Sequence, residues 1–471
     1  MLGRSHAVIA TALSLIGPMI GSVGAVSTTD AVVVRAVLSA PAPPPRPHVP
    51  ADGTAPKGPT EPKGPTELTD LRGPATTSFR FPNGARSVLM STGHLRTAKN
   101  NAWQPINLTL RQDPDGTVRP IGPAYPTELS GGGRVTDVAE VQGPTGITTS
   151  LKWNGTLPTP TITQNRAVYH QARPGSDLVV EATRTGFVAS LVPTSPAGRP
   201  AGVGGTSVGA PSIGGTPVGS TPVGSTPVGS TPVGSTVAGA ATATGAAPVS
   251  QALRLQITQP DGSDAAGAVQ SLAGQLAPAG RFGDGPVADR VVATAVRQSQ
   301  PPFSTTVQNT TPAAGSPADL SADPDLRVGS FDGRTVSRGY LTWDLGGLRG
   351  QPVAKATLRL FAEWSQTCDP QTWQVWSTGS IDPAAGWADQ PTAQRLWAST
   401  SVAKGHAGCP AGWVNVDVTP LVQQWARTGA STGTVMIRAA DEANPRSWKR
   451  FTSGEGLKPP TLGITLAAPT Q

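Results

Sequence analysis

Tryptophan is the residue type in this sequence most suited to ligand binding, because a flat indole can stack on a sugar ring. Nine of the eleven tryptophans lie between Trp343 and Trp448. Core packing is the alternative, since large aromatic side chains are mostly buried, and it is our interpretation of three that lie on apolar faces: Trp343, Trp413 and Trp425. Five others lie in or near segments that connect predicted strands and are candidate ligand-binding residues: Trp364, Trp373, Trp376, Trp387 and Trp397.

No arrangement of residues typical of an enzyme is evident. Gly205-Thr-Ser-Val-Gly209 matches the G-x-S-x-G nucleophile motif, but it lies in low-complexity sequence without the strand and helix that this motif requires. After the first 74 residues, histidine occurs only at His94, His170 and His406, each isolated from any candidate nucleophile. There is no H-E-x-x-H, P-loop or paired C-x-x-C. We therefore expect no catalytic residue and no cofactor.

Carboxylates offer the one route to catalysis, because glycosidase or lyase chemistry needs two acids at a defined separation. The best placed are Asp417, Asp441, Glu442 and Glu455. Structural roles compete with that interpretation: Asp417 ends a predicted strand before a helix, and Asp441 and Glu442 begin a predicted turn. Whether any two converge depends on the fold.

The first 25 residues resemble a secretory signal peptide. Arg4 provides the charged region, residues 7–16 the apolar region, and Val23-Gly24-Ala25 a small-residue cleavage site. A membrane anchor is the alternative, but Gly17-Pro18 interrupts the apolar run well short of the ~20 residues that a span needs. We expect a secreted, extracellular or cell-surface protein that has no membrane segment after cleavage.

The two cysteines, Cys368 and Cys409, fit an exported chain, in which a cysteine pair normally forms a disulfide. On the chain-entropy estimate such a bridge stabilises the fold by roughly 4 kcal/mol. A metal site made of Cys368, His406 and Cys409 is the alternative, but it lacks the C-x-x-C and paired-histidine spacing of zinc sites. We predict the disulfide and no metal.

Composition indicates small β-domains joined by linkers. Glycine and proline are abundant, at 56 and 49 of 471 residues, and charged residues make up 14%, against about 25% in typical globular proteins. The formal net charge is +7, but lysine and arginine form no cluster, so nucleic-acid binding is not indicated.

The sequence divides into segments of different pattern. Turn-separated strands predict a first β-domain, and alternating, tryptophan-rich strands predict a second. The linker between them repeats Pro-Val-Gly-Ser-Thr, a unit with too little apolar surface to form a core. The predicted segments are a signal (1–25), a Pro-rich disordered spacer (26–74), an N-terminal β-domain (75–195), a disordered linker (196–250), a poorly defined partial β region (251–320) and a C-terminal β-sandwich (321–467).

One short helix interrupts the strands of the C-terminal domain. Thr419 is its predicted N-cap, Pro420 its first residue and Gly429 its end, with Leu421, Val422 and Trp425 on one side. We expect it to cover one end of the sandwich.

Several motifs of the last 150 residues occur in the order typical of the DNRLRE domain of secreted proteins, which this region resembles. They are Arg338-Gly-Tyr-Leu-Thr-Trp-Asp-Leu345, Val353-Ala-Lys-Ala-Thr-Leu-Arg-Leu360, Trp387 with Gln390-Pro391, Cys409-Pro-Ala-Gly-Trp-Val414, Asp417-Val-Thr-Pro-Leu-Val422, Ala440-Asp-Glu442 and Trp448-Lys-Arg-Phe-Thr-Ser453. The resemblance implies a jelly-roll-like β-sandwich related to carbohydrate-binding modules, and a Cys368–Cys409 pairing.

The first β-domain resembles the segment that often precedes this one in RHS or YD-repeat proteins. The residues concerned include Trp103-Gln-Pro-Ile-Asn-Leu-Thr-Leu110 and Pro174-Gly-Ser-Asp-Leu-Val-Val180. No YD repeat occurs in the sequence, which departs from those relatives.

Three hypotheses for function follow. The first is an exported, non-catalytic binding or cell-surface protein whose C-terminal sandwich binds a polysaccharide or wall glycan. The second is a structural or adhesion remnant of an RHS-type shell protein. The third is a polysaccharide lyase or hydrolase that uses the four carboxylates named above.

Overall fold

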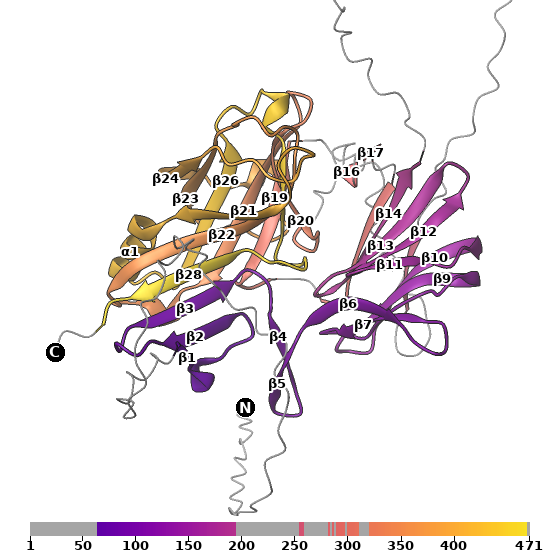
Figure 1. The fold of residues 1–471 in the computed structure, drawn as a ribbon, viewed down its shortest axis with the longest axis horizontal. Coiled ribbons are helices and arrows are strands. Elements are labelled where there is room, and N and C mark those ends of the chain that lie inside the picture. Colours follow the sequence, from indigo (N-terminus) through magenta and orange to yellow (C-terminus); the bar gives the residue numbers. More distant parts are fainter. Residues whose placement is uncertain are drawn as a thin grey trace, which may run out of the picture. The chain divides into compact units, whose positions relative to one another are not determined.

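The computed structural model of the chain describes residues 64–194, 254–258, 281–282, 285–286, 289–296, 299–309 and 320–468. The predicted signal peptide, the PVGST-repeat linker, the Gly205–Gly209 motif and residues 26–63 of the Pro-rich spacer lie outside these ranges. Residues 64–74 of the predicted disordered spacer are described and contain a short strand, Thr66–Glu67, and a 3-10 turn, Thr69–Leu71. The described residues form two β-sandwiches with one α-helix, which confirms the predicted all-β class (Figure 1). No helix in these ranges is long and apolar enough to cross a membrane.

The C-terminal sandwich consists of two layers that join where β20 pairs with both β27 and β21. The first layer has the order β1 (Thr66–Glu67), β2 (Thr76–Arg80), β3 (Arg86–Ser91), β28 (Thr461–Leu466), β22 (Val353–Ser365), β27 (Lys449–Thr452) and β20 (Asp325–Ser330), with β25 (Gly412–Asp417) also paired to β22. The second has β19 (Phe303–Gln308), β21 (Val336–Asp344), β26 (Thr432–Ala439), β23 (Trp373–Thr378) and β24 (Ala393–Thr400).

Alternating side chains from both layers fill the core between them. On β28, Leu462 and Ile464 are 1% exposed, as the alternating pattern predicted. They pack in one cluster with Leu358 and Leu360 of β22 and with Trp343 of β21. Each layer therefore has an inner, apolar face and an outer face of different composition.

The N-terminal strands β2 and β3 belong to the C-terminal sandwich. β3 pairs antiparallel with β28, with Met90 opposite Leu462, and the two strands lie side by side in Figure 1. Met90 is buried in the same core cluster. This pairing differs from the expected boundaries, which placed residues 75–195 in one separate domain. Sequence cannot show it, because the paired residues lie more than 350 positions apart.

The single helix of the described residues, α1 (Thr419–Thr428), buries Leu421, Val422 and Ala426 in the main core. Its start differs slightly from the prediction, because Thr419 is the first helical residue rather than the N-cap. The Thr419 backbone N–H donates to Asp417 Oδ1 at 2.8 Å, so the acid that precedes the helix satisfies its free donor. Gly429 ends the helix in the left-handed region at φ 67°, as predicted.

The second sandwich surrounds its own core, which contains Leu129, Leu151, Tyr169, Leu178 and Phe187. One sheet has the order β15 (Arg254–Thr258), β10 (Thr148–Leu157), β9 (Gly133–Gln142), β8 (Thr127–Leu129), β7 (Val118–Gly122) and β6 (Asn107–Gln112). The other has β11 (Thr161–Thr163), β12 (Arg166–Arg173), β13 (Ser176–Ala182), β14 (Gly186–Pro193) and β18 (Asp289–Thr294).

Short elements complete the described residues. The expected partial β region of 251–320 supplies β15 and β18 to the second sandwich and β19 to the first. Two hairpins pair only internally: β4 (Arg96–Lys99) with β5 (Ala102–Pro105), and β16 (Arg281–Phe282) with β17 (Gly285–Pro286). The 3-10 turns are η1 (Thr69–Leu71), η2 (Gly346–Leu348), η3 (Trp387–Asp389) and η4 (Pro445–Ser447).

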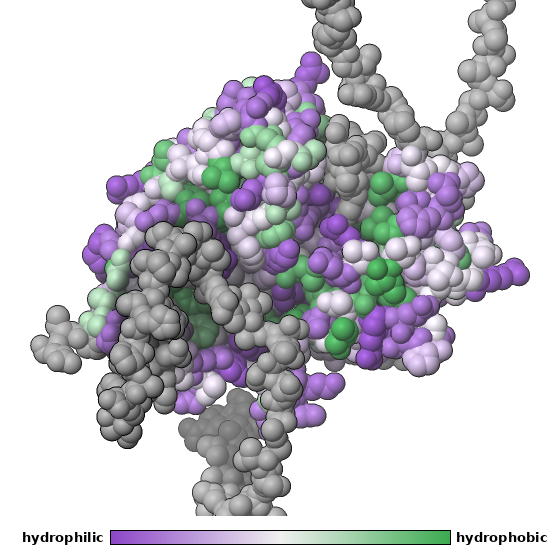
Figure 2. Space-filling model, in the orientation of Figure 1, coloured by the Kyte–Doolittle hydropathy of each residue, from purple (hydrophilic) through white to green (hydrophobic). Residues whose placement is uncertain are grey.

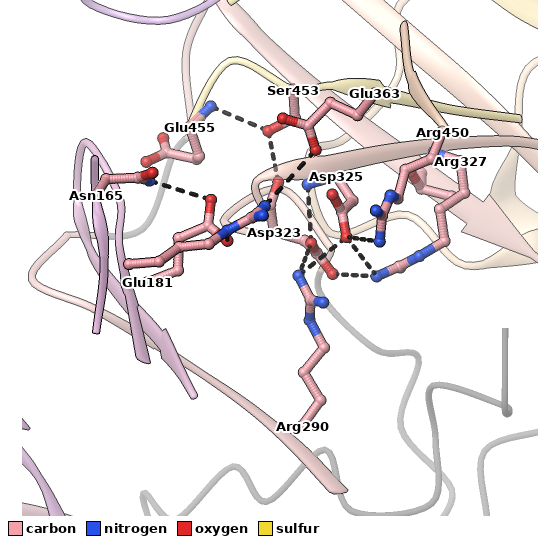
Figure 3. Close-up of polar contacts among 12 residues, drawn as sticks. Asn165, Glu181, Arg290, Asp323, Asp325, Arg327, Glu363, Arg450, Ser453 and Glu455 are labelled. Carbon is pink, nitrogen blue, oxygen red and sulfur yellow. Dashed lines mark hydrogen bonds and ion pairs between the residues drawn. The ribbon is translucent and has the colours of Figure 1, made fainter. Parts of the chain in front are cut away.

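A buried ionic network connects strands of the two sandwiches (Figure 3). The carboxylate of Asp323, which is fully buried, accepts from Arg290 Nη2 at 2.6 Å and from Arg327 Nη2 at 2.7 Å. Arg290 comes from β18, whereas Arg327 lies on β20 of the C-terminal sandwich. Burial alone would raise the pKa of Asp325, but Arg450, Arg290 and Arg327 outweigh it and lower that pKa to about 2. Asp325 is therefore ionised at neutral pH.

The predicted disulfide is confirmed: Cys368 and Cys409 are bonded, with their Cα atoms 5.7 Å apart. Cys368 follows β22 and Cys409 precedes β25, so the bridge closes the segment that contains β23, η3 and β24. His406, the third residue of the alternative metal site, lies with Nδ1 3.6 Å from Cys368 Sγ.

Removing the disulfide should destabilise the C-terminal sandwich. We expect Cys368→Ser combined with Cys409→Ser to lower the free energy of unfolding by about 2–5 kcal/mol, because the bridge closes a long loop. Denaturant unfolding followed by tryptophan fluorescence measures the change. Ser401→Ala, which removes an exposed hydroxyl in the same segment, is the control. An unchanged midpoint in the double variant would contradict the prediction.

Candidate functional site

The structure separates the five candidate tryptophans into buried and surface residues. Trp373 is fully buried on β23 and stacks edge-on against Phe451 with ring centroids 5.3 Å apart. Trp364 lies on β22, is 9% exposed and clusters with Trp448. These two are core residues, which corrects the expectation that they line a ligand site. Side chains alternate between the two faces of each strand, and both indoles lie at positions where other side chains bury them.

Trp376 and Trp387 come together on the outer face of the second layer. Both are half-buried and pack on a small apolar cluster that contains Tyr340 of β21 and Met436 of β26. Tyr340 pairs with Met436, and Met436 pairs with Trp376, so one row of the sheet carries all three. Trp387 reaches this row from η3 in the loop between β23 and β24.

Arg338 is fixed on this face by contacts on several sides. Its guanidinium lies over the Trp387 ring, 4.5 Å from the centroid. Nε and Nη2 donate to the two carboxylate oxygens of Glu442 at 2.8 and 2.7 Å, and Nη1 donates to Gln390 Oε1 at 2.9 Å. The Tyr340 hydroxyl donates to the same Gln390 oxygen at 3.1 Å. Burial raises the pKa of Tyr340 to about 12, so this hydroxyl stays protonated.

A second arginine lies on the neighbouring strand. Arg438 of β26 lies over the Trp376 ring, 5.2 Å from the centroid, and its Nε donates to Gln374 Oε1 at 3.4 Å. Trp376 Nε1 donates to the same Gln374 oxygen at 2.9 Å. Within the described ranges, the two terminal nitrogens of Arg438 have no protein partner. They can therefore donate hydrogen bonds to a ligand.

We call this surface the aromatic–arginine face and define it by Arg338, Tyr340, Gln374, Trp376, Trp387, Gln390, Arg438 and Glu442. It combines two half-buried indoles with amide, guanidinium and carboxylate groups in fixed positions. Rigid aromatic rings and oriented hydrogen-bond groups are what recognition of a sugar requires, since sugars present both C–H faces and hydroxyl edges.

The remaining tryptophans of the C-terminal sandwich have other roles. Trp397 of β24 packs on the main core from its edge, with Arg395 over its ring at 4.2 Å. Trp425 packs on that core as expected but is only half-buried. Trp413, also expected in the core, lies half-buried on β25 instead.

The four candidate carboxylates each have a local partner. Glu442 pairs with Arg338, and Asp417 accepts from the Thr419 N–H. Asp441 accepts from the Ala443 N–H at 3.1 Å. Glu455 is 3% exposed and accepts from both the N–H and the hydroxyl of Thr185 at 2.9 Å. The contacts of Asp441, Asp417 and Glu455 hold a turn, a helix start and a buried contact in place, and that of Glu442 orients Arg338 on the aromatic–arginine face.

A cavity of about 370 Å³ in the other sandwich also contains carboxylates. Glu128 and Glu140 lie opposite each other on β8 and β9. Glu128 pairs with Arg119 at 2.9 Å, and Ser150 Oγ donates to Glu140 at 2.9 Å. The lining has no aromatic side chain. It lacks the stacking surface of the aromatic–arginine face.

Sequence reasoning identified Trp376 and Trp387 as candidate ligand-binding residues and Glu442 as a candidate catalytic carboxylate, but assigned no ligand-binding role to the other polar members of the aromatic–arginine face. Arg338, Gln390 and Glu442 all lie in the motifs that carry the family resemblance, which is the signal that pointed to them. Gln374 lies two residues before Trp376 on the same strand, so alternation places both on one face, whereas Arg438 is brought to them only by the pairing of β23 with β26. The side of the molecule drawn in Figure 2 shows hydrophobic residues in separate patches among hydrophilic ones, with no continuous apolar surface.

Comparison with known proteins gives a family match for part of the chain. Residues 300–466 match the family model of carbohydrate-binding module family 96. The match begins just before β19 and ends with β28, so it contains every residue of the aromatic–arginine face. No curated protein matches the chain significantly. The family match supports a carbohydrate-binding role for the C-terminal region.

Proposed function

We propose that the protein is an exported, non-catalytic binding protein whose aromatic–arginine face binds a polysaccharide or wall glycan. The observation that carries this proposal is the convergence of Trp376 and Trp387 with Arg338 and Arg438 on one face, within the segment that matches a carbohydrate-binding family. Export is supported by the signal-like first 25 residues and by the disulfide.

The contacts on this face suggest how a sugar would be held. The Arg338 guanidinium is already oriented by Glu442, Gln390 and Trp387, so little side-chain entropy is lost when a hydroxyl accepts from it. Arg438 offers further donors beside Trp376. A non-catalytic role is supported by the structural contacts of the four carboxylates described above.

Trp387→Ala should weaken polysaccharide binding. The indole supports Arg338 and provides contact area, so we expect a loss of about 1–2 kcal/mol, or about 5- to 30-fold in Kd. Pull-down on insoluble polysaccharides and calorimetry on soluble ones, with the full chain, measure the change. The ligands tested are a panel of neutral glycans and a panel of acidic glycans.

Trp103→Ala is the matched control, since Trp103 is 37% exposed on the β4–β5 hairpin, outside the segment matched by the family. Its removal should leave Kd unchanged. Equal effects of the two substitutions, or retention of the native protein on no glycan, would refute the assignment of this face.

A further inference from the structure

A second group of aromatic and basic side chains lies on the outer face of the opposite layer. Phe361 of β22 and Trp413 of β25 are paired across the strands, with ring centroids 5.4 Å apart in an edge-on arrangement. Arg359 lies over the Trp413 ring at 4.8 Å, and Lys458 Nζ lies 3.6 Å from the Phe361 centroid. We call these four residues the cationic strip.

The two cations of the strip have no carboxylate partner within the described part of the chain. Arg359 Nε donates to Asn415 Oδ1 at 3.2 Å, which leaves both terminal nitrogens available. The nearest acid along the same face of β22 is Glu363, but it belongs to the buried arginine network and lies 3.8 Å from Arg166 Nη2. At the other end, Asp417 is engaged by the Thr419 N–H. Neither Arg359 nor Lys458 forms an ion pair among the described residues, so both keep N–H groups that can donate to an anion.

The rings hold these cations in position. A cation over an aromatic face is attracted by the ring quadrupole and stays charged, while its remaining N–H groups point away from the ring. Each ring therefore favours one position of its cation. Binding an anion there costs less entropy than ordering two free surface chains would.

The loop that carries Lys458 is itself fixed. Gly454 packs so closely on Gly93 that a Cβ at Gly93 would lie 1.8 Å from the Gly454 carbonyl oxygen. The carbonyl oxygen of Pro460 in the same loop accepts a hydrogen bond from the Thr92 N–H at 3.1 Å. These contacts with the segment after β3 hold Lys458 over Phe361.

We propose that the cationic strip is a second binding surface, which takes the carboxylate or sulfate groups of an acidic polysaccharide. It lies on the layer opposite the aromatic–arginine face, with the main core between them. One molecule can therefore hold two glycan chains at once. The preference for a glycan over nucleic acid rests on the proposed function and on the small size of the strip, because duplex binding needs a longer basic stripe.

The test compares four variants of the full chain with the native protein by calorimetry at low and moderate salt. Arg359→Gln with Lys458→Gln removes the strip, and Arg334→Gln with Arg427→Gln removes two exposed charges elsewhere as a matched control. Trp387→Ala reports on the aromatic–arginine face. The probes are polygalacturonate, chondroitin sulfate, neutral arabinoxylan and a short DNA duplex.

We expect the strip variant to bind one of the two acidic polysaccharides about tenfold more weakly, since two charge-assisted contacts are lost. The control variant should bind like the native protein, and Trp387→Ala should keep the strip's contribution. Thermal unfolding of each variant checks folding, and Lys458→Met alone gives a milder second variant.

Equal loss in the strip and control variants would overturn the proposal, as would DNA binding as tight as that of the acidic glycans, or no acidic-glycan binding by the native protein. Failure of the proposed function would give a different result: Trp387→Ala would then leave the affinity for every glycan probe unchanged.

Discussion

Asp323→Asn should lower the free energy of unfolding by about 3–5 kcal/mol, because it removes one partner of a buried ion network. Arg290 and Arg327 are both about 2% exposed and both donate to Asp323. Asparagine has nearly the same shape as aspartate but no charge. Its side-chain NH2 group would also place N–H donors against the N–H donors of the arginines. Urea unfolding followed by fluorescence and circular dichroism measures the change.

The effect should also reach the contact between the two sandwiches, since Arg290 comes from β18 and Asp323 precedes β20. We expect hydrogen exchange in β18 to accelerate in this variant. Asp382→Asn is the control, because Asp382 is exposed and asparagine can still accept from the Ala384 N–H. A change below about 1 kcal/mol for Asp323→Asn would show that the arginines are solvated.

Trp373→Ala should cost a similar amount, about 3–5 kcal/mol, because it leaves a cavity in the main core. The indole is fully buried, contacts Phe451, and donates from Nε1 to the Val402 carbonyl at 3.3 Å. The same unfolding assay measures the loss. Glycan affinity of the fraction that stays folded should be unchanged.

The comparison with Trp387→Ala separates core residues from ligand-binding ones. Trp387 is half-buried on the outer face, so its removal should change affinity much more than stability. Trp373→Phe, which keeps an aromatic ring in the core, should recover part of the stability. If Trp373→Ala instead weakened binding without destabilising the protein, the placement of this residue in the core would be wrong.

The Trp373–Trp376 segment shows which side-chain positions can be predicted from the sequence and which cannot. Side chains alternate along a strand, so residues 373 and 376 must point to opposite faces. Alternation alone does not say which face is inward. The answer comes from the pairing of β23 with β26, which sets Trp373 beside Ala439 and Trp376 beside Met436.

The sequence by itself determined the properties that local pattern and composition control. Alternating apolar residues indicated most strands of the C-terminal sandwich, although not β20 or β24. Pro420 and Gly429 marked the two ends of its helix to within one residue, and a single cysteine pair specified its disulfide. These features depend on neighbouring residues or on having only one possible partner. Motif order further pointed to a carbohydrate-binding sandwich, in agreement with the matched family.

The tertiary structure alone decided which strands are neighbours and hence which side chains meet. β3 completes the sheet at β28, and Arg338, Gln390 and Glu442 converge from three separate segments. The buried network likewise joins Arg290 to Asp323 across two sandwiches. The physical reason is that β-pairing is non-local. The period of two determines which residues share a face, but only burial of both layers against one core determines which face is inward and which strands are neighbours.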